Sequence, residues 1–248
     1  MQNQVAVMAS FVTDEGVMVP AITAKEMREV DRIAIDDESP SLLQMMENAG
    51  RNLASTAVEQ LGPGWRNTPI TVFAGPGGNG GGGICAARHL ANHGGDVTLI
   101  LADHHEMSPA ADQQLTIYQK TPGRTQSLGS FERGLILDAL IGYGLEGAPR
   151  GQAREMIQAM REAAGPVISL DVPSGLDSTT GETPGESVEA ITTLALALPK
   201  TGLSATAAGD VWLGDLGIPN AVYERAGIHL PQSIFDGRYR IPLHRQVP

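Results

Sequence analysis

The chain has 248 residues, long enough for one large domain with a well-filled core, and we expect a single domain. Its 42% apolar and 18% charged residues are ordinary globular values and argue against a disordered or coiled-coil protein. A formal net charge of −11 argues against a nucleic-acid or anionic-membrane partner, because such binding needs a basic surface.

Targeting and redox features point to a soluble protein. Cys85 is the only cysteine, so no internal disulfide can form. No basic residue precedes Lys25, which argues against a signal peptide. No apolar run reaches the roughly 18 residues that a membrane helix requires. We therefore expect a cytoplasmic protein with no membrane partner.

Two helices are predicted near the start of the chain. Residues 1–20 show no lasting period, and we interpret them as an N-terminal extension to a single domain over residues 21–248. Thr23 and Glu26 form a capping box that begins the first helix. A second helix is predicted from Ser41 to about Gln60, where a Gly-Pro-Gly stop signal follows.

Strands and helices alternate along the rest of the chain. Short apolar runs predict strands at 70–74, 97–102, 135–140, 167–170, 190–198 and 211–213, with helices at 84–93, from 108, and at 153–163. Apolar strands separated by helices are typical of right-handed crossovers in a parallel sheet that is covered on both faces. The predicted fold class is a doubly wound α/β domain with a mostly parallel sheet, preceded by two helices.

Three polar or glycine-rich segments follow predicted strands. They are Gly75 to Gly83, Asp138 to Gly144, and Asp171 to Asp177. Ligands of open α/β sheets bind outside the carboxyl ends of the strands, where the strand order reverses. We therefore expect the three segments to converge on one ligand site.

The glycine-rich segment, Gly75-Pro-Gly-Gly-Asn-Gly-Gly-Gly-Gly83, is predicted to be a turn between a strand and a helix. Its backbone N–H groups could bind a phosphate, helped by the dipole of the following helix. The segment lacks the Lys-Ser/Thr ending of a Walker nucleotidase, and its G-x-G spacings are weak signals in so glycine-dense a run. A flexible loop with no ligand is the alternative.

Asp138 and Asp171 each follow an apolar strand directly. A carboxylate at such a position needs a cation or a hydrogen-bond donor close to it. A hard cation would accept Asp138 together with Asn79 and the Ser174 hydroxyl, because all three offer oxygen ligands. The alternative is that both aspartates are N-caps or loop stabilisers, which is common for Asp after a strand.

Three other candidates are weaker. His104 and His105 are interpreted as part of a solvated loop, because no further ligand lies at metal-binding spacing. Cys85 is placed near a helix start, where its thiol pKa could fall, but no base is identifiable and a packed residue is the favoured interpretation. Ser174 lacks the G-x-S-x-G elbow of a serine hydrolase.

The motifs together resemble the NAD(P)H-hydrate epimerases, the YjeF N-terminal domain family. The segment from Gly75 to Gly83, followed by Ala-Ala-Arg-His-Leu90, resembles the family signature G-P-G-N-N-G-G-D-G…A-R-H-L. The segments beginning at Asp138 and Asp171 are similar to the family's D-A-L-F-G-T-G-L and D-I-P-S-G-L-D. Further matches are Met45 to Gly50, Leu198 to Leu203, and Gly214 to Pro219, so the likeness spans about residues 22–220 in order.

The resemblance implies a Rossmann-like three-layer domain, a homodimer, that interconverts the R and S epimers of hydrated NADH or NADPH. It implies a potassium ion held by Asn79, Asp138 and Ser174, with Asp171 as the catalytic acid/base. The substrate contacts it implies are Gly78, Asn79, Gly80, Gly81, Gly82, Gly142, Tyr143, Gly144, Leu145, Glu146, Gly147, Ala148 and Asp171. The family often carries a dehydratase on the same chain, so a separate NAD(P)H-hydrate dehydratase is an implied partner.

The chain departs from the family pattern in the glycine-rich segment. The first Asn and the Asp of N-N-G-G-D-G are replaced by Gly78 and Gly82, and Tyr143 replaces a threonine in the second motif. Loss of the Asp removes a carboxylate, which would alter substrate preference or weaken epimerisation. A non-catalytic nucleotide- or protein-binding module of the same fold is therefore the alternative function, and another nucleotide-dependent enzyme on a similar sheet is a third.

Overall fold

A computed structural model describes residues 10–36, 40–129, 131–204, 206–231 and 234–246. The strands are β1 (Ser10–Val12), β2 (Met18–Pro20), β3 (Ile70–Ala74), β4 (Val97–Leu101), β5 (Arg124–Gln126), β6 (Leu135–Ala139), β7 (Val167–Leu170), β8 (Thr192–Leu196), β9 (Asp210–Gly214) and β10 (Arg240–Arg245). The α-helices are α1 (Ala24–Asp36), α2 (Leu42–Leu61), α3 (Gly78–Asn92), α4 (Pro109–Tyr118), α5 (Gly151–Glu162) and α6 (Asn220–Arg225). Short 3₁₀ turns are η1 (Gly62–Asn67), η2 (His104–Glu106), η3 (Thr201–Ser204) and η4 (Thr206–Ala208).

The described strands form one sheet in the order β2-β1-β10-β9-β8-β7-β6-β3-β4-β5. All pairs from β9 to β5 are parallel, whereas β10, β1 and β2 are joined to that edge by antiparallel pairs. The chain order reverses between β3 and β6, the point at which doubly wound sheets bind ligands. The predicted fold class, a mostly parallel α/β sheet preceded by two helices, is confirmed.

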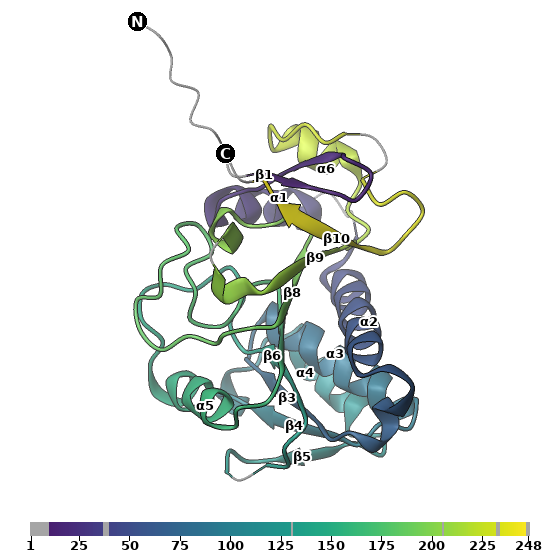
Figure 1. Cartoon of the computed structure of the whole chain (residues 1–248), viewed down its shortest axis with the longest axis vertical. Helices are drawn as coiled ribbons and strands as arrows, with labels where there is room; N and C mark the ends of the chain where they lie inside the picture. The colour runs from purple at the N-terminus through teal and green to yellow at the C-terminus, as the bar shows by residue number, and fades with distance from the viewer. Residues whose placement is uncertain (1–9, 37–39, 130, 205, 232–233, 247–248) are drawn as a thin grey trace, which may run out of the picture.

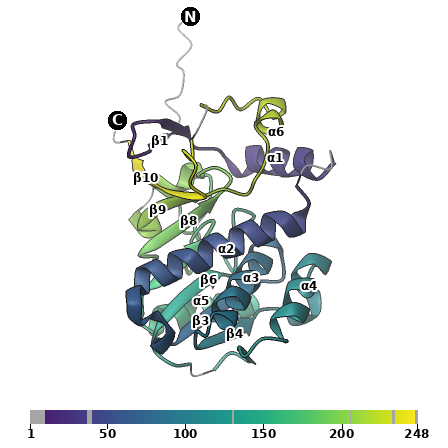
Figure 2. The ribbon, with the colours of Figure 1, turned by 90° about the vertical axis from the view of Figure 1, so that its right-hand side faces the viewer.

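Helices cover both faces of the sheet. Figures 1 and 2 show α2, α3 and α4 together on one face and α5 on the opposite face, and α1 lies with α6 at the β10 end. One core cluster packs α2, α3 and α4 on strands β3 to β8, a second packs α5 on the other face, and a third packs α1 and α6 on β8 to β10. Among the described residues, none of the helices combines the length and apolar character needed to cross a bilayer.

The helix caps follow the sequence signals. Glu26 accepts from the Thr23 backbone N–H (2.7 Å), and Thr23 accepts from the Glu26 N–H (3.3 Å), as the capping box predicts. Ser41 caps α2 with a second box through Gln44, and the Ser108 hydroxyl accepts from the Ala111 N–H at the start of α4.

The segment interpreted as an N-terminal extension lies partly in the sheet. Residues 1–9 fall outside the described part of the chain, but residues 10–20 supply β1 and β2, and β1 pairs with β10. Sequence patterning did not predict these strands, nor β5, β10 or α6. Pro242 within β10 argues against a strand that has neighbours on both sides, because proline cannot donate to the ladder.

The predicted glycine turn is mostly helical. Helix α3 begins at Gly78, six residues before the predicted start at residue 84, and Gly81 donates to the Gly77 carbonyl (3.0 Å) within its first turn. Glycine costs about 1 kcal/mol relative to alanine in a helix interior, so local propensity argues against a helix here. The missing side chains instead allow close packing. A Cβ on Gly83 would lie 2.4 Å from Ala139 Cβ in β6, and a Cβ on Gly80 would lie 1.7 Å from the Gly75 carbonyl oxygen.

Candidate functional site

A cavity of about 580 Å³ opens at the carboxyl ends of β3, β6 and β7, beside the reversal of strand order. This volume lies within the usual range for small-molecule and cofactor sites. Its walls come from α1, α2, the start of α3, the segment after β6, and the segments after β7 and β8. The lining residues are Met27, Arg28, Asp31, Ile35, Leu42, Met45, Met46, Ala49, Gly77, Gly78, Asn79, Gly80, Leu140, Ile141, Gly142, Tyr143, Gly144, Glu146, Asp171, Leu196, Lys200 and Leu216.

The N-terminus of α3 points into this cavity. Gly77 caps the helix with its backbone alone, and the first helical residues have N–H groups without intrahelical partners. Those N–H groups and the helix dipole favour a negatively charged group such as a phosphate. The side-chain oxygen and nitrogen of Asn79, in the same turn, are buried and have no hydrogen-bond partner among the described residues. Orphaned buried amide atoms are rare and indicate a missing polar partner.

Asp138, at the end of β6, is fully buried and joins two neighbouring segments. Its carboxylate accepts the Ser174 hydroxyl (2.6 Å), the Ser174 N–H (2.8 Å), the Ser169 hydroxyl (2.8 Å) and the Leu140 N–H (3.2 Å). Burial raises the pKa of Asp138, and the hydrogen bonds from Ser174 oppose that rise. No ion pair balances its charge within the described residues, so a nearby cation would fit this environment.

Asp171 and Lys200 form a buried ion pair in the cavity wall. The Lys200 ammonium contacts Asp171 Oδ1 (2.5 Å) and donates to the Leu196 carbonyl (2.8 Å), and both residues are at most 3% exposed. Asp171 adopts a left-handed backbone conformation with φ of 67°, which is uncommon outside glycine and clusters at functional sites. Its other oxygen accepts the Tyr143 N–H (2.9 Å). The pair therefore fixes the position of the Asp171 carboxylate at the edge of the cavity.

Tyr143 links the second motif to helix α1. Its hydroxyl donates to Asp31 Oδ2 (2.5 Å), and its ring lies under the Lys200 ammonium at 5.5 Å from the ring centroid. Burial raises the pKa of Asp31, whereas the hydrogen bond from Tyr143 lowers it. The cavity wall therefore holds Asp31 and Asp171, on segments far apart in the chain, together with Glu146, which pairs with Arg28.

The structure brings most of the predicted site residues together. A Cβ on Gly142 would lie 3.1 Å from both Asn79 Cγ and Asp171 Oδ2, so the three segments meet at this residue. The predicted substrate contacts that line the cavity are Gly78, Asn79, Gly80, Gly142, Tyr143, Gly144, Glu146 and Asp171.

The other predicted substrate contacts lie elsewhere. Gly81 packs against Met46, and Gly82 packs against Leu170 and Ala49. Leu145, Gly147 and Ala148 belong to the same segment as Tyr143 but are not among the lining residues. Contact of these five residues with a substrate stays a prediction.

Sequence reasoning missed Lys200 and Asp31 as site residues. Lys200 follows the apolar strand β8, which ends at Leu196, and a cation so close to a buried strand is a signal that a partner carboxylate is needed. Asp31 lies in a helix whose buried face holds Met27, Val30 and Ile33, and nothing in that pattern indicates what Asp31 contacts.

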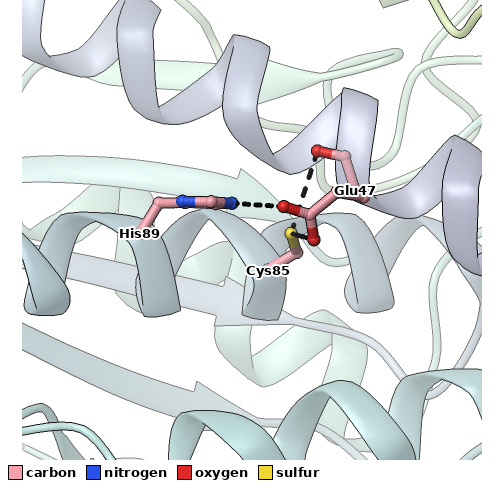
Figure 3. A group of neighbouring side chains, drawn as sticks. All are labelled: Glu47, Cys85 and His89. Carbon is pink, nitrogen blue, oxygen red and sulfur yellow. Dashed lines mark hydrogen bonds and ion pairs between the residues drawn. The ribbon is translucent and has the colours of Figure 1, made fainter.

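A second polar cluster lies between α2 and α3, outside the cavity lining. Figure 3 shows Glu47 of α2 facing Cys85 and His89 of α3, and their ligand atoms lie within 4.8 Å of one another. Such residues could hold a metal ion, but the Arg88 guanidinium already contacts the Glu47 carboxylate and the Cys85 sulfur (3.2 Å). Arg88 thus supplies the positive charge that a metal would bring, and the cluster joins the two helices.

Cys85 is not at a helix start, because α3 begins seven residues earlier. Burial, reinforced by the Glu47 charge, raises the pKa of the Cys85 thiol to about 12. The sequence interpretation of Cys85 as a packed, unreactive residue agrees with this environment.

Comparisons of this chain with family models, with curated proteins and with solved structures agree with one another. The family model described as "YjeF-related protein N-terminus" matches residues 42–202. An NAD(P)H-hydrate epimerase of Dehalogenimonas lykanthroporepellens is 49% identical over 94% of this chain and 96% of its own length. An NAD(P)H-hydrate epimerase of Truepera radiovictrix is 34% identical over 84% of this chain and 94% of its own length.

Longer relatives carry additional sequence. The bifunctional NAD(P)H-hydrate repair enzyme Nnr of Hyperthermus butylicus is 41% identical over 72% of this chain, but the match spans 35% of that relative. Among solved structures, that of yeast ynu0 superposes with a TM-score of 0.76, covering 90% of this chain and 100% of the yeast chain at 21% identity. At this identity, the match to the yeast structure is evidence for the fold only.

Proposed function

This chain belongs to the YjeF-related protein N-terminus family of NAD(P)H-hydrate epimerases, and we propose that it interconverts the R and S epimers of hydrated NADH and NADPH. It is an isomerase. The main support for the substrate assignment is the cavity at the sheet reversal, which is lined by the first residues of α3, by the half-buried Asp31 and by the buried Asp171. The helix terminus suits the substrate's phosphates, and the carboxylates suit proton transfer at its hydrated ring.

The chemistry at the ring defines what the site must do. Inverting the carbon that bears the hydroxyl requires loss and return of that hydroxyl, or opening of the ring. Either route needs proton transfer at the hydroxyl oxygen and stabilisation of a cationic or open intermediate. Asp171 performs the proton transfer in this proposal, because it lines the cavity and Lys200 fixes its position.

Replacing Asp171 by Asn tests this role. The rate should fall by about a hundredfold or more, the usual range for an acid/base group. An Asn variant with unchanged turnover would remove Asp171 from the role. Binding of NADP or ADP-ribose to the variant serves as the control for a folded site.

A potassium ion is the proposed cofactor, held by Asn79, Asp138 and Ser174. The orphaned Asn79 amide oxygen and the buried Asp138 charge are both compatible with a cation. When bound, the ion would supply positive charge that offsets the substrate's phosphates. The Ser174 hydroxyl, which accepts the Ile141 N–H (2.8 Å), would then hold the segment after β6 in place. Thermal unfolding with potassium or with a large organic cation checks this, and only potassium should raise the Tm.

The decisive assay follows the R epimer. The protein is mixed with R and S NADH hydrate and potassium, an NAD(P)H-hydrate dehydratase removes the S form, and chromatography follows the R form. Disappearance of R above the spontaneous rate supports the proposal. Disappearance at the spontaneous rate would leave the non-catalytic binding function instead, which crystals soaked with NADP would then test.

The assembly and the partner enzyme belong to the same proposal. A homodimer is expected from the family resemblance, and light scattering on the eluting protein measures it directly. The dehydratase is the expected partner in function, since the relatives named as bifunctional repair enzymes are longer than this chain.

A further inference from the structure

Two carboxylates of the cavity wall, those of Asp31 and Asp171, are held at opposite ends of one residue, Tyr143. The Tyr143 backbone N–H donates to Asp171 Oδ2, while the Tyr143 hydroxyl donates to Asp31 Oδ2. One tyrosine side chain therefore sets the separation between them. Both residues line the same cavity, so a substrate bound there can lie beside both carboxyl groups.

The environments of the two carboxylates differ. Asp171 forms an ion pair with the Lys200 ammonium. Within the described part of the chain Asp31 has no ion pair, and burial raises its pKa, which favours the protonated form. The charged or titratable groups that act on Asp31 or Tyr143 are Lys200, Asp171, Arg28 and Tyr223.

When inversion proceeds by loss and return of the hydroxyl, protons are exchanged on both faces of the ring. If the hydroxyl leaves from one face as water, a new water must attack from the other face and lose a proton there. Inverting glycosidases solve the same problem with two carboxyl groups far enough apart to leave room for water. Pairs of carboxyls whose environments differ commonly divide the acid and base roles.

We propose that Asp31 is a second catalytic residue, which exchanges protons on the ring face opposite to Asp171, with Tyr143 as the residue that positions it. This inference rests on the proposed function. Protonated Asp31 gives its proton to the hydroxyl oxygen, and the carbon–oxygen bond breaks with its electron pair leaving on water. The lone pair of the adjacent ring nitrogen forms a carbon–nitrogen double bond.

The second half of the reaction restores the hydrate. Water attacks the same carbon from the Asp171 side, and the double-bond electrons return to nitrogen. Asp171 then takes the proton from the attacking water. One water leaves and one enters, and exchange with solvent returns the proton to Asp31. In the reverse direction the two aspartates exchange roles.

The test compares Asp31→Asn with Asp36→Asn. Asp36 lies in the same helix, pairs with the exposed Arg32, and does not line the cavity. Asp31→Asn should lose about a hundredfold or more in both directions, while Asp36→Asn should keep the wild-type rate. The wild-type rate should fall on the alkaline side as Asp31 loses its proton, at a pH above that of an ordinary aspartate, and Asp31→Asn should lack this limb.

Tyr143→Phe gives an independent measurement that does not depend on the Asn variant folding. It keeps the ring but removes the hydroxyl that lowers the pKa of Asp31, so the alkaline limb should move to higher pH. An Asp31→Asn variant with the rate of Asp36→Asn, or a Tyr143→Phe variant with an unshifted limb, overturns the inference. A wild-type protein that does not exceed the spontaneous rate overturns the proposed function instead.

Discussion

Replacing Gly80 by alanine should destabilise the protein, whereas the same change at Gly78, two residues earlier in α3, should not. A Cβ on Gly80 would lie 1.7 Å from the Gly75 carbonyl oxygen and 2.6 Å from its carbon. Carbon and oxygen normally approach to about 3.3–3.6 Å even in close Cα–H···O contacts, and the obstructing atoms are backbone that cannot rotate away. Overpacking typically costs about 1–3 kcal/mol, and a backbone clash belongs at the upper end.

Gly78 is the matched control because a Cβ there would meet nothing within 4 Å. Its alanine variant should be stabilised by about 0.4–1 kcal/mol, because alanine restricts the unfolded chain. The two variants should therefore differ by roughly 3–4 kcal/mol, which is a difference in Tm of about 6–16 °C for a chain of this size. Calorimetry measures it, and melting of Gly80→Ala within about 2 °C of Gly78→Ala would refute the close-packing explanation.

Other substitutions test the remaining parts of the site. Gly78→Asn should fold normally, because its side chain has open space, whereas Gly82→Asp should lower the Tm, because it buries a carboxylate among apolar groups; circular dichroism melts compare the two. Lys200→Met should lose about 3–5 kcal/mol in urea unfolding by leaving Asp171 unpaired, and the double variant with Asp171→Asn should recover stability but not activity. Cys85 should resist iodoacetamide at pH 8, where a pKa of about 12 leaves roughly one thiolate in ten thousand thiols, and rapid labelling of the native protein would contradict its buried environment.

The convergence of polar segments was predictable because it follows from the topology. Parallel strands share a carboxyl edge, so Asp138 and Asp171 had to lie at the same end of the sheet once β6 and β7 were identified. The hydrogen bonds between Asp138 and Ser174 connect the two segments as that reasoning expects. Helix starts were also predictable, because capping signals such as those at Thr23 and Ser41 depend only on residues three positions apart in the sequence.

The partners of the site residues were not predictable, because they depend on tertiary packing. Lys200 can be buried only because Asp171 balances its charge, and the two residues are separated by β8 in the chain. Asp31 reaches the cavity only through the position of α1 over the second motif. The helical start at Gly78 runs against the low helix propensity of glycine, so only the contacts made by α3 explain it.

The position of Gly82 bears on whether replacing the family's Asp with glycine weakens catalysis. A carboxylate at this position would point at Leu170 and Ala49, into the packing between β7 and α2, and Gly82 does not line the cavity. Its absence therefore removes no charge from the cavity wall of this chain, whose carboxylates belong to Asp31, Glu146 and Asp171. Residue 78 does line the cavity, so Gly78 replaces a polar side chain there with bare backbone. The departure at residue 78 should accordingly affect how the substrate is bound, while the carboxylates proposed to transfer protons remain in place, which favours catalysis over a binding-only function.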